Sequence, residues 1–187
     1  MSKTVEIDHT TFEIDIEHFS FPSFHRISDM DELAKLSMLP RLRSASFYGT
    51  QLDDRGLVHI SRVSTIENLN LQDTLVTNAG LAHAAQLTRL QYLRLKENRQ
   101  LTNDCVPHIL RITALVDLAI HETSIDQQGA NQLTALPNLQ DLCVDVYNGN
   151  YTFDGLRDLS ARMPSCRILA KSRGEFLAGE FEGVWNR

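Results

Sequence analysis

Residues 87–98 read LTRLQYLRLKEN, and this stretch decides the fold. Leucines stand at its first, fourth, seventh and ninth positions, and Asn98 ends it. Leu93 and Leu95 are separated by one residue, so both side chains point to the same side of an extended strand. The stretch therefore predicts a short strand with one buried apolar side and one exposed polar side.

The same pattern recurs along the chain at a nearly constant step. Copies begin at residues 39, 63, 87, 112 and 136, so the step is 24 or 25 residues. A degenerate sixth copy reads Met163-x-x-Cys166-x-x-Leu169. A fixed period of this length indicates a solenoid, in which each unit buries its apolar side against its neighbours.

The second half of each unit has repeated positions of its own. One position holds a small residue, and the position three residues earlier holds a side-chain oxygen that can cap a helix. One of these small residues is a cysteine, which rarely adopts a positive φ angle, so the position does not require the backbone conformation that favours glycine. We therefore expect that it requires a small side chain, because neighbouring helices meet there. The small residues are Gly56, Gly80, Cys105, Gly129 and Gly155, and the predicted caps are Asp53, Thr77, Thr102, Asp126 and Thr152.

These residues resemble the leucine-rich-repeat family, in the ribonuclease-inhibitor-like variety that has helices on its outer side. The resemblance covers about residues 31–171. It implies an α/β solenoid with a curved parallel sheet on the concave side and short helices on the convex side. It also implies binding through the concave face and the rims, with no residue-level function to transfer, since this scaffold carries many unrelated tasks.

The chain divides into a repeat region and two ends. Residues 31–171 hold about five full units and the degenerate sixth. Residues 1–30 alternate apolar and polar side chains on both sides of residues 8–11, which predicts a β-hairpin cap. Residues 172–187 carry aromatic residues among glycines and acids, and they form either a C-terminal cap or a flexible tail. A cap is favoured because an open solenoid end exposes its core.

The residues between the buried leucines should face the concave side, because side chains alternate along a strand. They form three columns across the units. We predict that a partner binds these columns and the long turn after the fifth strand, where Tyr and Arg, which are typical of binding hot spots, occur. The candidates are Tyr48, Tyr92, Arg94, Lys96, Asp117, His121, Asp141, Asp145 and Tyr147. In the sixth unit the columns would continue with Ile168, Ala170 and Ser172.

The predicted concave face is polar, with its acids toward the C-terminal end. Asp117, Asp141 and Asp145 would lie on adjacent strands, where a basic patch on a partner would relieve their repulsion. The alternative interpretation is an ordinary solvated sheet face. The turn at 145–151 lengthens its unit, and Tyr147 there is either a second contact or part of a tolerated insertion.

Two clusters could carry chemistry. His59, His83 and His108 recur at one position and could hold a metal, but structural zinc usually has four ligands, so exposed helix residues are favoured. The second cluster joins the concave acids to His121 and Cys143, and its carboxylates could bind a divalent cation. It lies on an open sheet without an enclosing pocket. We therefore expect no metal, no cofactor and no catalytic residue.

Composition restricts the partner and the compartment. The chain has 187 residues, with 18 Lys and Arg against 24 Asp and Glu, and a formal net charge of -6. This charge disfavours nucleic acid and anionic membranes as partners. The first residues lack the apolar core of a signal peptide and no apolar run could span a bilayer, so we expect a cytoplasmic protein. The odd number of cysteines, 3, does not indicate a disulfide framework.

The leading hypothesis is a non-catalytic protein-binding module that recognises a partner protein through its concave sheet face. In one version it is an inhibitor or immunity protein that occludes an enzyme or toxin. The alternative is an adaptor or structural subunit of a larger protein assembly, and an enzyme is the least favoured class. The repeat pattern indicates neither the partner's identity nor the oligomeric state.

Overall fold

The computed structural model of the chain describes residues 3–22, 25–147 and 149–185. Outside this description lie residues 1–2, 23–24, 148 and 186–187. They belong to the predicted N-terminal cap, the long turn and the C-terminal segment. Within the described part of the chain, no helix combines the length and the apolar character needed to cross a membrane.

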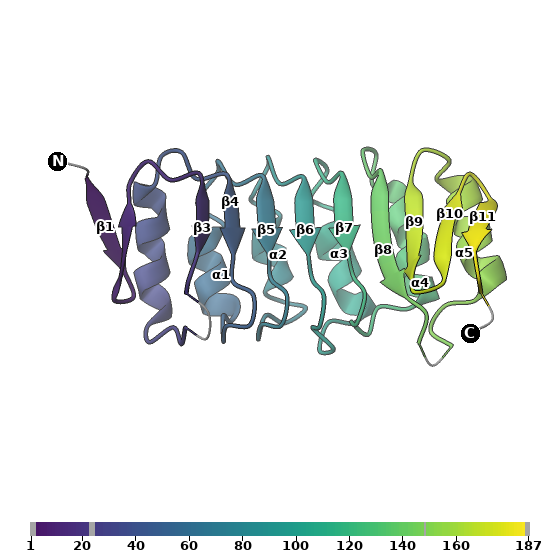
Figure 1. The fold of residues 1–187 in the computed structure, drawn as a ribbon, viewed down its shortest axis with the longest axis horizontal. Coiled ribbons are helices and arrows are strands. Elements are labelled where there is room, and N and C mark those ends of the chain that lie inside the picture. The colour runs from purple at the N-terminus through teal and green to yellow at the C-terminus, as the bar shows by residue number, and fades with distance from the viewer. Residues whose placement is uncertain (1–2, 23–24, 148, 186–187) are drawn as a thin grey trace.

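One nine-stranded sheet runs the length of the molecule, in the order β11-β10-β9-β8-β7-β6-β5-β4-β3 (Figure 1). From β3 to β9, each strand pairs in parallel with the next one along the chain. The parallel strands are β3 (His18–Ser20), β4 (Ser44–Ser46), β5 (Asn68–Asn70), β6 (Tyr92–Arg94), β7 (Asp117–Ala119), β8 (Asp141–Asp145) and β9 (Arg167–Lys171).

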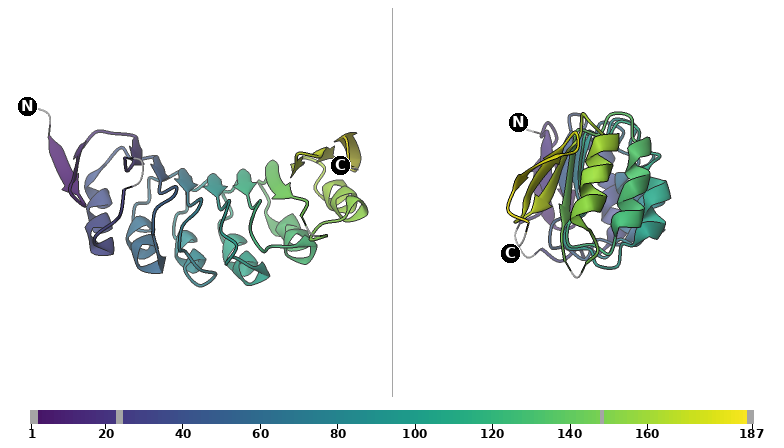
Figure 2. Two further views of the ribbon diagram at one scale, coloured as in Figure 1. Left: turned by 60° about the horizontal axis from the view of Figure 1, so that its bottom comes forward. Right: turned by 90° about the vertical axis from the view of Figure 1, so that its right-hand side faces the viewer.

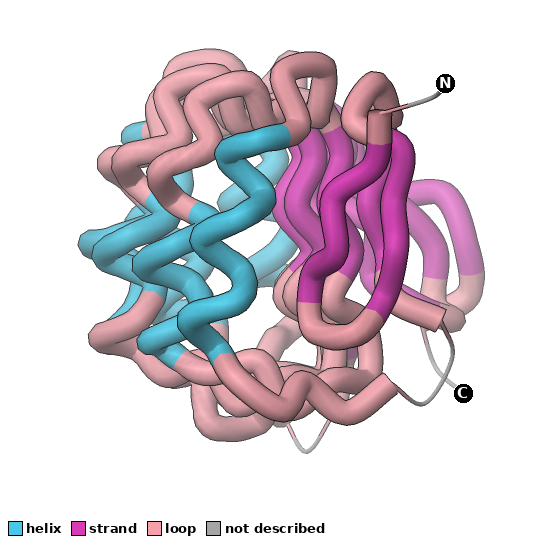
Figure 3. The backbone as a smooth tube through the Cα atoms, turned by 90° about the vertical axis from the view of Figure 1, so that its left-hand side faces the viewer, coloured by secondary structure: helices cyan, strands magenta, loops and turns pink. Residues whose placement is uncertain are grey.

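Helical elements connect the parallel strands and form a second layer behind the sheet (Figure 3). The strands lie on the inner side of the curved molecule and the helices on its outer side (Figure 2). The predicted α/β solenoid with a concave sheet is therefore confirmed. The α-helices are α1 (Asp54–Ile60), α2 (Leu81–Ala84), α3 (Val106–Ile109), α4 (Gln127–Gln132) and α5 (Phe153–Arg162). The 3-10 helices are η1 (Met30–Met38), η2 (Asn103–Cys105) and η3 (Leu133–Ala135).

The core lies between the two layers and is continuous from the N-terminal hairpin to β10. Buried leucines of adjacent strands pair in register and form a ladder inside the sheet. Its members include Leu69, Leu93, Leu118 and Leu142. Because a single unit would leave this apolar side in water, the units are stable only when they stack.

Four of the five predicted helix caps are confirmed. Side-chain oxygens accept hydrogen bonds from backbone N–H groups at the starts of four helical elements. These caps are Asp53, Thr102, Asp126 and Thr152. Thr77 is the exception, because its hydroxyl donates to Oδ2 of Asp54 in the preceding unit at 2.6 Å, and α2 begins only at Leu81.

The space at the repeated small residues is too narrow for a larger side chain, as predicted. A Cβ atom on Gly80 would lie 1.9 Å from Oδ1 of Asp54, and one on Gly129 would lie 2.2 Å from Oδ1 of Asn103. Asp54 and Asn103 hold successive units together. Nδ2 of Asn103, for example, donates to Oδ1 of Asp126 in the next unit at 2.7 Å. Gly80 and Gly129 therefore leave room for hydrogen bonds that join one unit to the next, whereas Gly56 leaves room for the apolar side chains of Leu52, Met30 and Leu33.

The sixth unit differs from the prediction by one residue. β9 pairs Arg167 with Asp141 and Ile168 with Leu142. Ile168 is therefore buried, whereas Leu169 is 39% exposed, contrary to the prediction. A shift of one residue exchanges the two sides of a strand. The concave positions of this unit are held by Arg167, Leu169 and Lys171, in place of Ile168, Ala170 and Ser172.

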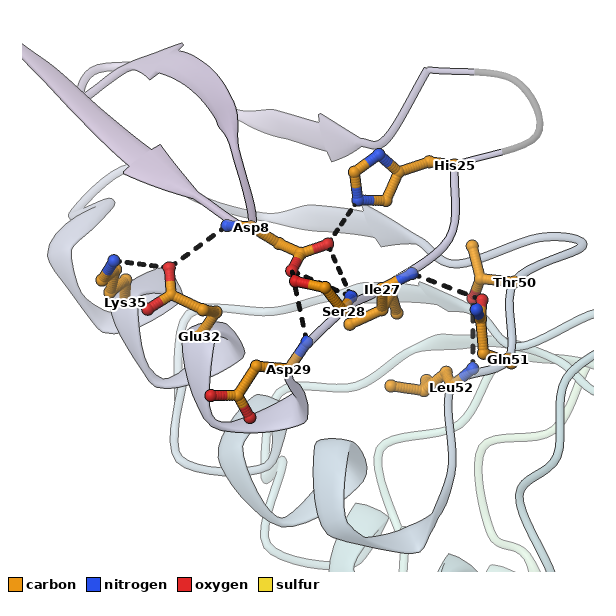
Figure 4. A network of polar contacts seen from close by, with 10 residues as sticks. All are labelled: Asp8, His25, Ile27, Ser28, Asp29, Glu32, Lys35, Thr50, Gln51 and Leu52. Carbon is orange, nitrogen blue, oxygen red and sulfur yellow. Dashed lines mark hydrogen bonds and ion pairs between the residues drawn. The ribbon is translucent and has the colours of Figure 1, made fainter.

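The N-terminal end is a hairpin of β1 (Thr4–Ile7) and β2 (Thr10–Glu13) that lies against η1 (Figure 1). In its turn, the buried carboxylate of Asp8 ties the hairpin to the segment before η1 (Figure 4). Asp8 accepts hydrogen bonds from the backbone N of Ser28 at 2.9 Å and from the Ser28 hydroxyl, and Nε2 of His25 lies 2.6 Å from its Oδ2. Burial alone would raise the pKa of Asp8, but these hydrogen bonds outweigh burial and hold the pKa below its usual value.

The C-terminal end is a second hairpin, which continues the sheet in antiparallel fashion. It consists of β10 (Gly174–Leu177), paired with β9, and β11 (Glu180–Gly183). Phe176 is buried, with its ring centroid 4.6 Å from that of Phe181 and 5.3 Å from that of Phe153. Trp185 packs edge-on against Phe153, with ring centroids 5.3 Å apart. The described part of the C-terminal segment is thus a folded cover over the last repeat.

Candidate binding surface

The strand register brings the predicted columns together on the concave face. One column runs from Tyr92 through Asp117 to Asp141, and the next runs from Arg94 through Ala119 to Cys143. Parallel strands lie about 4.8 Å apart, so the side chains of a column are direct neighbours. Through the fifth unit, the pairing of strands agrees with the columns expected from the repeat pattern.

Two tyrosines and an arginine lie in the middle and N-terminal part of this face. Tyr48 follows β4 and is 59% exposed, and Tyr92 in β6 is 44% exposed. Arg94, two residues beyond Tyr92 on the same strand, is also exposed. β6 has a paired strand on each side, which fixes the backbone of Tyr92 and Arg94. The backbone on either side of Tyr48 is held by hydrogen bonds from N of Phe47 to the carbonyl O of Asn70 at 2.9 Å and from N of Gly49 to the carbonyl O of Gln72 at 3.1 Å. Exposed Tyr and Arg on a rigid backbone are well suited to contribute binding energy.

Lys96 is less available than Arg94, because it already has a partner. Its Nζ lies 2.8 Å from Oε1 of Glu97, which raises the pKa of Lys96. Glu97 also accepts a hydrogen bond from Nε2 of Gln72 at 2.9 Å. The hydrogen bonds from Lys96 and Gln72 lower the pKa of Glu97 to about 2. The positive charge of Lys96 is therefore balanced within the face.

Two of the acids toward the C-terminal end are paired with the basic residues of β9. Nε of Arg167 donates to Oδ1 of Asp141 at 2.7 Å, and Lys171 forms an ion pair with Glu122. Oδ1 of Asp145 accepts a hydrogen bond from the backbone N of Glu122 at 2.7 Å. The one-residue shift in β9 is what places Arg167 and Lys171 on this side of the sheet. In the acidic cluster expected from the sequence, Asp141 and Glu122 therefore have basic partners, whereas Asp117 and Asp145 form no ion pair in the described part of the chain.

His121 and Asp117 are less accessible than strand alternation predicts. His121 is only 4% exposed, so the expectation of an exposed imidazole is wrong. Burial, followed by the charge of Lys171, lowers the pKa of His121, and its Nδ1 has no hydrogen-bond partner in the described part of the chain. Asp117 is half-buried, and burial and the charge of Asp141 raise its pKa. An uncharged His121 lies within the face at neutral pH and offers little contact surface.

The two tyrosines of the long turn, Tyr147 and Tyr151, differ in exposure. Tyr147 is exposed at the rim. Tyr151 is buried, its hydroxyl donates to the carbonyl O of Ile125 at 2.9 Å, and burial raises its pKa. Asn150 closes the turn by donating from Nδ2 to the carbonyl O of Asp145 at 3.1 Å. Tyr147 is thus accessible to a partner, whereas Tyr151 belongs to the core.

The strands end in left-handed backbone, which the repeat pattern does not predict. The residue after the third concave column has a φ angle between 52° and 68° in five places. These residues are Gly49, Asp73, Glu97, Glu122 and Ser172. Gly and Asp adopt this conformation easily and are a sequence signal for it, but the glutamates and the serine give none. The left-handed residues form one rim of the concave face.

A hollow of about 610 Å³ lies at the C-terminal part of this rim. Its walls come from the loop after β6, the loop after β7, the long turn after β8 and the loop after β9. The basic residues Arg99, Lys171 and Arg173 line it together with Tyr147. Of these four, only Tyr147 is among the residues predicted to bind a partner. We call this feature the rim hollow.

The two clusters that were weighed as possible sites of chemistry do not form a metal-binding group in the described part of the chain. Across residues 3–22, 25–147 and 149–185, no group of three or more His, Cys, Asp or Glu side chains could hold a metal ion. His59 lies beside Asp31, with Nε2 3.1 Å from Oδ1. Burial raises the pKa of Cys143 to about 11, so the thiol is protonated at neutral pH and is a weak nucleophile.

Comparison with known proteins supports the fold. No protein-family model and no curated protein sequence matches the chain. Among solved structures, internalin C2 from Listeria monocytogenes is similar with a TM-score of 0.53 and 20% sequence identity, over 77% of this chain. This chain spans 65% of that internalin's length. A second internalin from the same organism matches over 77% of this chain and 56% of its own, with a TM-score of 0.45 and 14% identity. The likeness to internalin C2 shows the leucine-rich-repeat fold.

Proposed function

We propose that this chain is a non-catalytic protein-binding module and that the concave sheet face is its binding surface. One observation carries the proposal: Tyr92 and Arg94 are exposed on β6, which is paired on both sides, and Tyr48 is exposed on the same face just beyond β4. A fixed backbone limits the conformational entropy that is lost when a partner binds. Aromatic and arginine side chains then contribute most of the contact energy.

The partner's chemistry follows from the charges of the face. A basic patch on the partner would meet Asp117, Asp141 and Asp145, but the pairing of Asp141 with Arg167 and of Glu122 with Lys171 weakens that attraction. We therefore assign the larger share of the binding energy to Tyr48, Tyr92 and Arg94. The acids would set the orientation of the partner more than its affinity.

Two finer proposals concern the fold variety and the compartment. Helical elements behind the sheet favour the ribonuclease-inhibitor-like variety of the leucine-rich-repeat family. All three cysteines are free thiols: Cys105 and Cys166 are buried and Cys143 is half-buried. Free thiols are typical of a reducing compartment such as the cytoplasm.

An inhibitor or immunity protein that covers an enzyme or toxin is the version of protein binding that we favour. An adaptor or structural subunit of a larger assembly is the alternative.

The test is affinity purification from the source cell with three matched baits. The first is the unchanged chain, and the second carries Tyr48→Ala, Tyr92→Ala and Arg94→Ala. The third carries Gln86→Ala, Arg111→Ala and Gln132→Ala, which are exposed positions on the helical side. We expect the first and third baits to recover the same partner and the second to lose it, with equal melting temperatures for all three.

The outcomes separate the candidate functions. One dominant partner whose enzymatic activity falls on addition of the purified chain supports an inhibitor, whereas a stable complex of several subunits supports an adaptor. Full recovery of the partner by the second bait would contradict binding through the concave face. Turnover by the purified chain in a general hydrolase and transferase screen would contradict a non-catalytic role.

A further inference from the structure

The rim hollow has an excess of positive charge that its own carboxylates do not balance. Three basic residues and two acids line it. Glu122 pairs with Lys171, whereas Asp145 accepts the backbone N–H of Glu122 and keeps its charge, so the lining has one positive charge in excess. Lys171 is balanced by Glu122. Arg99 and Arg173 therefore remain as charges without a carboxylate partner in the described part of the chain.

Arg99 and Arg173 differ in how many of their guanidinium N–H groups are already hydrogen-bonded within the described part of the chain. Arg99 is exposed, and its guanidinium makes no hydrogen bond or ion pair with the described residues. Arg173 donates from Nη1 to the carbonyl O of Trp185, and its other guanidinium N–H groups make no hydrogen bond with the described residues. A guanidinium presents parallel N–H groups that match the two oxygens of a carboxylate. The pair is thus suited to an anionic, planar group.

The walls of the hollow are held in place by hydrogen bonds. The hydroxyl of Ser124 donates to the carbonyl O of Arg99 at 2.6 Å and joins two neighbouring loops. The long turn is closed by Asn150, which also accepts the backbone N–H of Tyr147 at 2.8 Å. A volume of about 610 Å³ is large enough for a side chain together with the backbone that carries it. The hollow is therefore formed before a ligand enters.

We propose that the rim hollow binds an acidic side chain of an extended segment of the partner protein, with Arg99 and Arg173 holding its carboxylate. The proposal rests on the protein-binding function and adds a second contact beside the concave face. Tyr147 at the edge of the hollow covers the neighbouring residues of the segment. The third column adjoins this rim, so a partner that lies along the columns has the hollow beside it at the C-terminal part of the face.

The test uses the full chain labelled with ¹⁵N and titrated with short peptides. The probes are a capped tetraglutamate peptide, a capped tetraglutamine peptide and succinate, each added at the same concentrations. We expect tetraglutamate to shift the amide signals of Ser124, Val146 and Ser172, and higher salt to weaken the binding. Arg99→Gln should weaken it about tenfold, the effect of losing one charge-assisted hydrogen bond.

Two controls make the result specific. Arg55→Gln removes an exposed arginine of α1, outside the hollow, and should leave tetraglutamate binding unchanged. The variant with Tyr48→Ala, Tyr92→Ala and Arg94→Ala should also bind tetraglutamate normally, so a failure of the concave face and a failure of the hollow are distinguishable. Equal shifts with tetraglutamine, or unchanged binding by Arg99→Gln, would overturn the carboxylate site. Tighter binding of succinate would overturn its assignment to a peptide.

Discussion

At the residue scale, the carboxylate of Asp8 joins the N-terminal hairpin to the first helical element. Its hydrogen bonds with Ser28 and His25 stabilise the ionised form, so its pKa is lower in the folded chain than in the unfolded chain. Its contribution to stability is then fully present above a pH of about 4 and is lost as the pH falls through the lowered pKa. We expect Asp8→Asn to lower the free energy of unfolding at pH 7 by about 1–3 kcal/mol.

Urea denaturation at pH 7 and at pH 3 measures this effect. The difference between Asp8→Asn and the unchanged chain should be smaller at pH 3, because the carboxylate of the unfolded chain, with its ordinary pKa of about 3.9, binds a proton there. Asp15→Asn is the matched control, because Asp15 is exposed on the segment that follows the same hairpin. An equal loss of stability at both pH values would show that the shape of Asp8, and not its charge, is what matters.

The exposure of individual residues on the binding surface could be predicted only within the strands, where side chains alternate between the two sides. Alternation places Tyr92 and Arg94 on the concave side, and they are exposed there. It fails at the third column, where Tyr48 is open but His121 is buried. This column lies where the chain leaves the strand and turns, so exposure depends on the loops of neighbouring units. No period in the sequence encodes how those loops pack.

At the scale of elements, the register of β9 could not be predicted from the repeat pattern. Residues 168–170 read Ile-Leu-Ala, so each of the two possible registers buries apolar side chains. β4, β5 and β6 avoid this ambiguity because polar residues, Ser46, Asn70 and Arg94, stand between their buried ones. The structure chooses the register that buries Ile168 and brings Arg167 beside Asp141. A salt bridge between strands, which is not a periodic signal, accompanies the shift.

Two single substitutions test this register. Ile168→Ala should lower the free energy of unfolding by about 2–5 kcal/mol, because it leaves a cavity in the core. Leu169→Ala should change it by less than about 1 kcal/mol, because that side chain is partly in water. Chemical denaturation of both variants under the same conditions gives the comparison. The reverse order of the two losses would restore the register that the repeat spacing predicts.

At the scale of the whole molecule, periodicity predicts the solenoid but not the features that break it. The sheet, its curvature and its outer helices follow from a repeated unit that cannot bury its apolar side alone. The rim hollow instead combines segments near residues 99, 123, 147 and 172, which meet only because neighbouring units stack. Arg99 and Arg173 fall outside the strand columns. Such a site becomes visible only once the three-dimensional arrangement is known.

The C-terminal hairpin should stabilise the whole solenoid, because it covers both the edge of β9 and the last helix. Phe176 has no exposed surface and packs against Phe153 of α5. Phe176→Ala should cost about 3–5 kcal/mol, which for a chain of this size lowers the melting temperature by roughly 6–20 °C. Leu177→Ala, one residue further and half exposed, is the control and should melt within about 2 °C of the unchanged chain. Differential scanning calorimetry measures both variants. If Phe176→Ala melts like the control, the hairpin is not coupled to the repeats, and the solenoid is stable without its C-terminal cover.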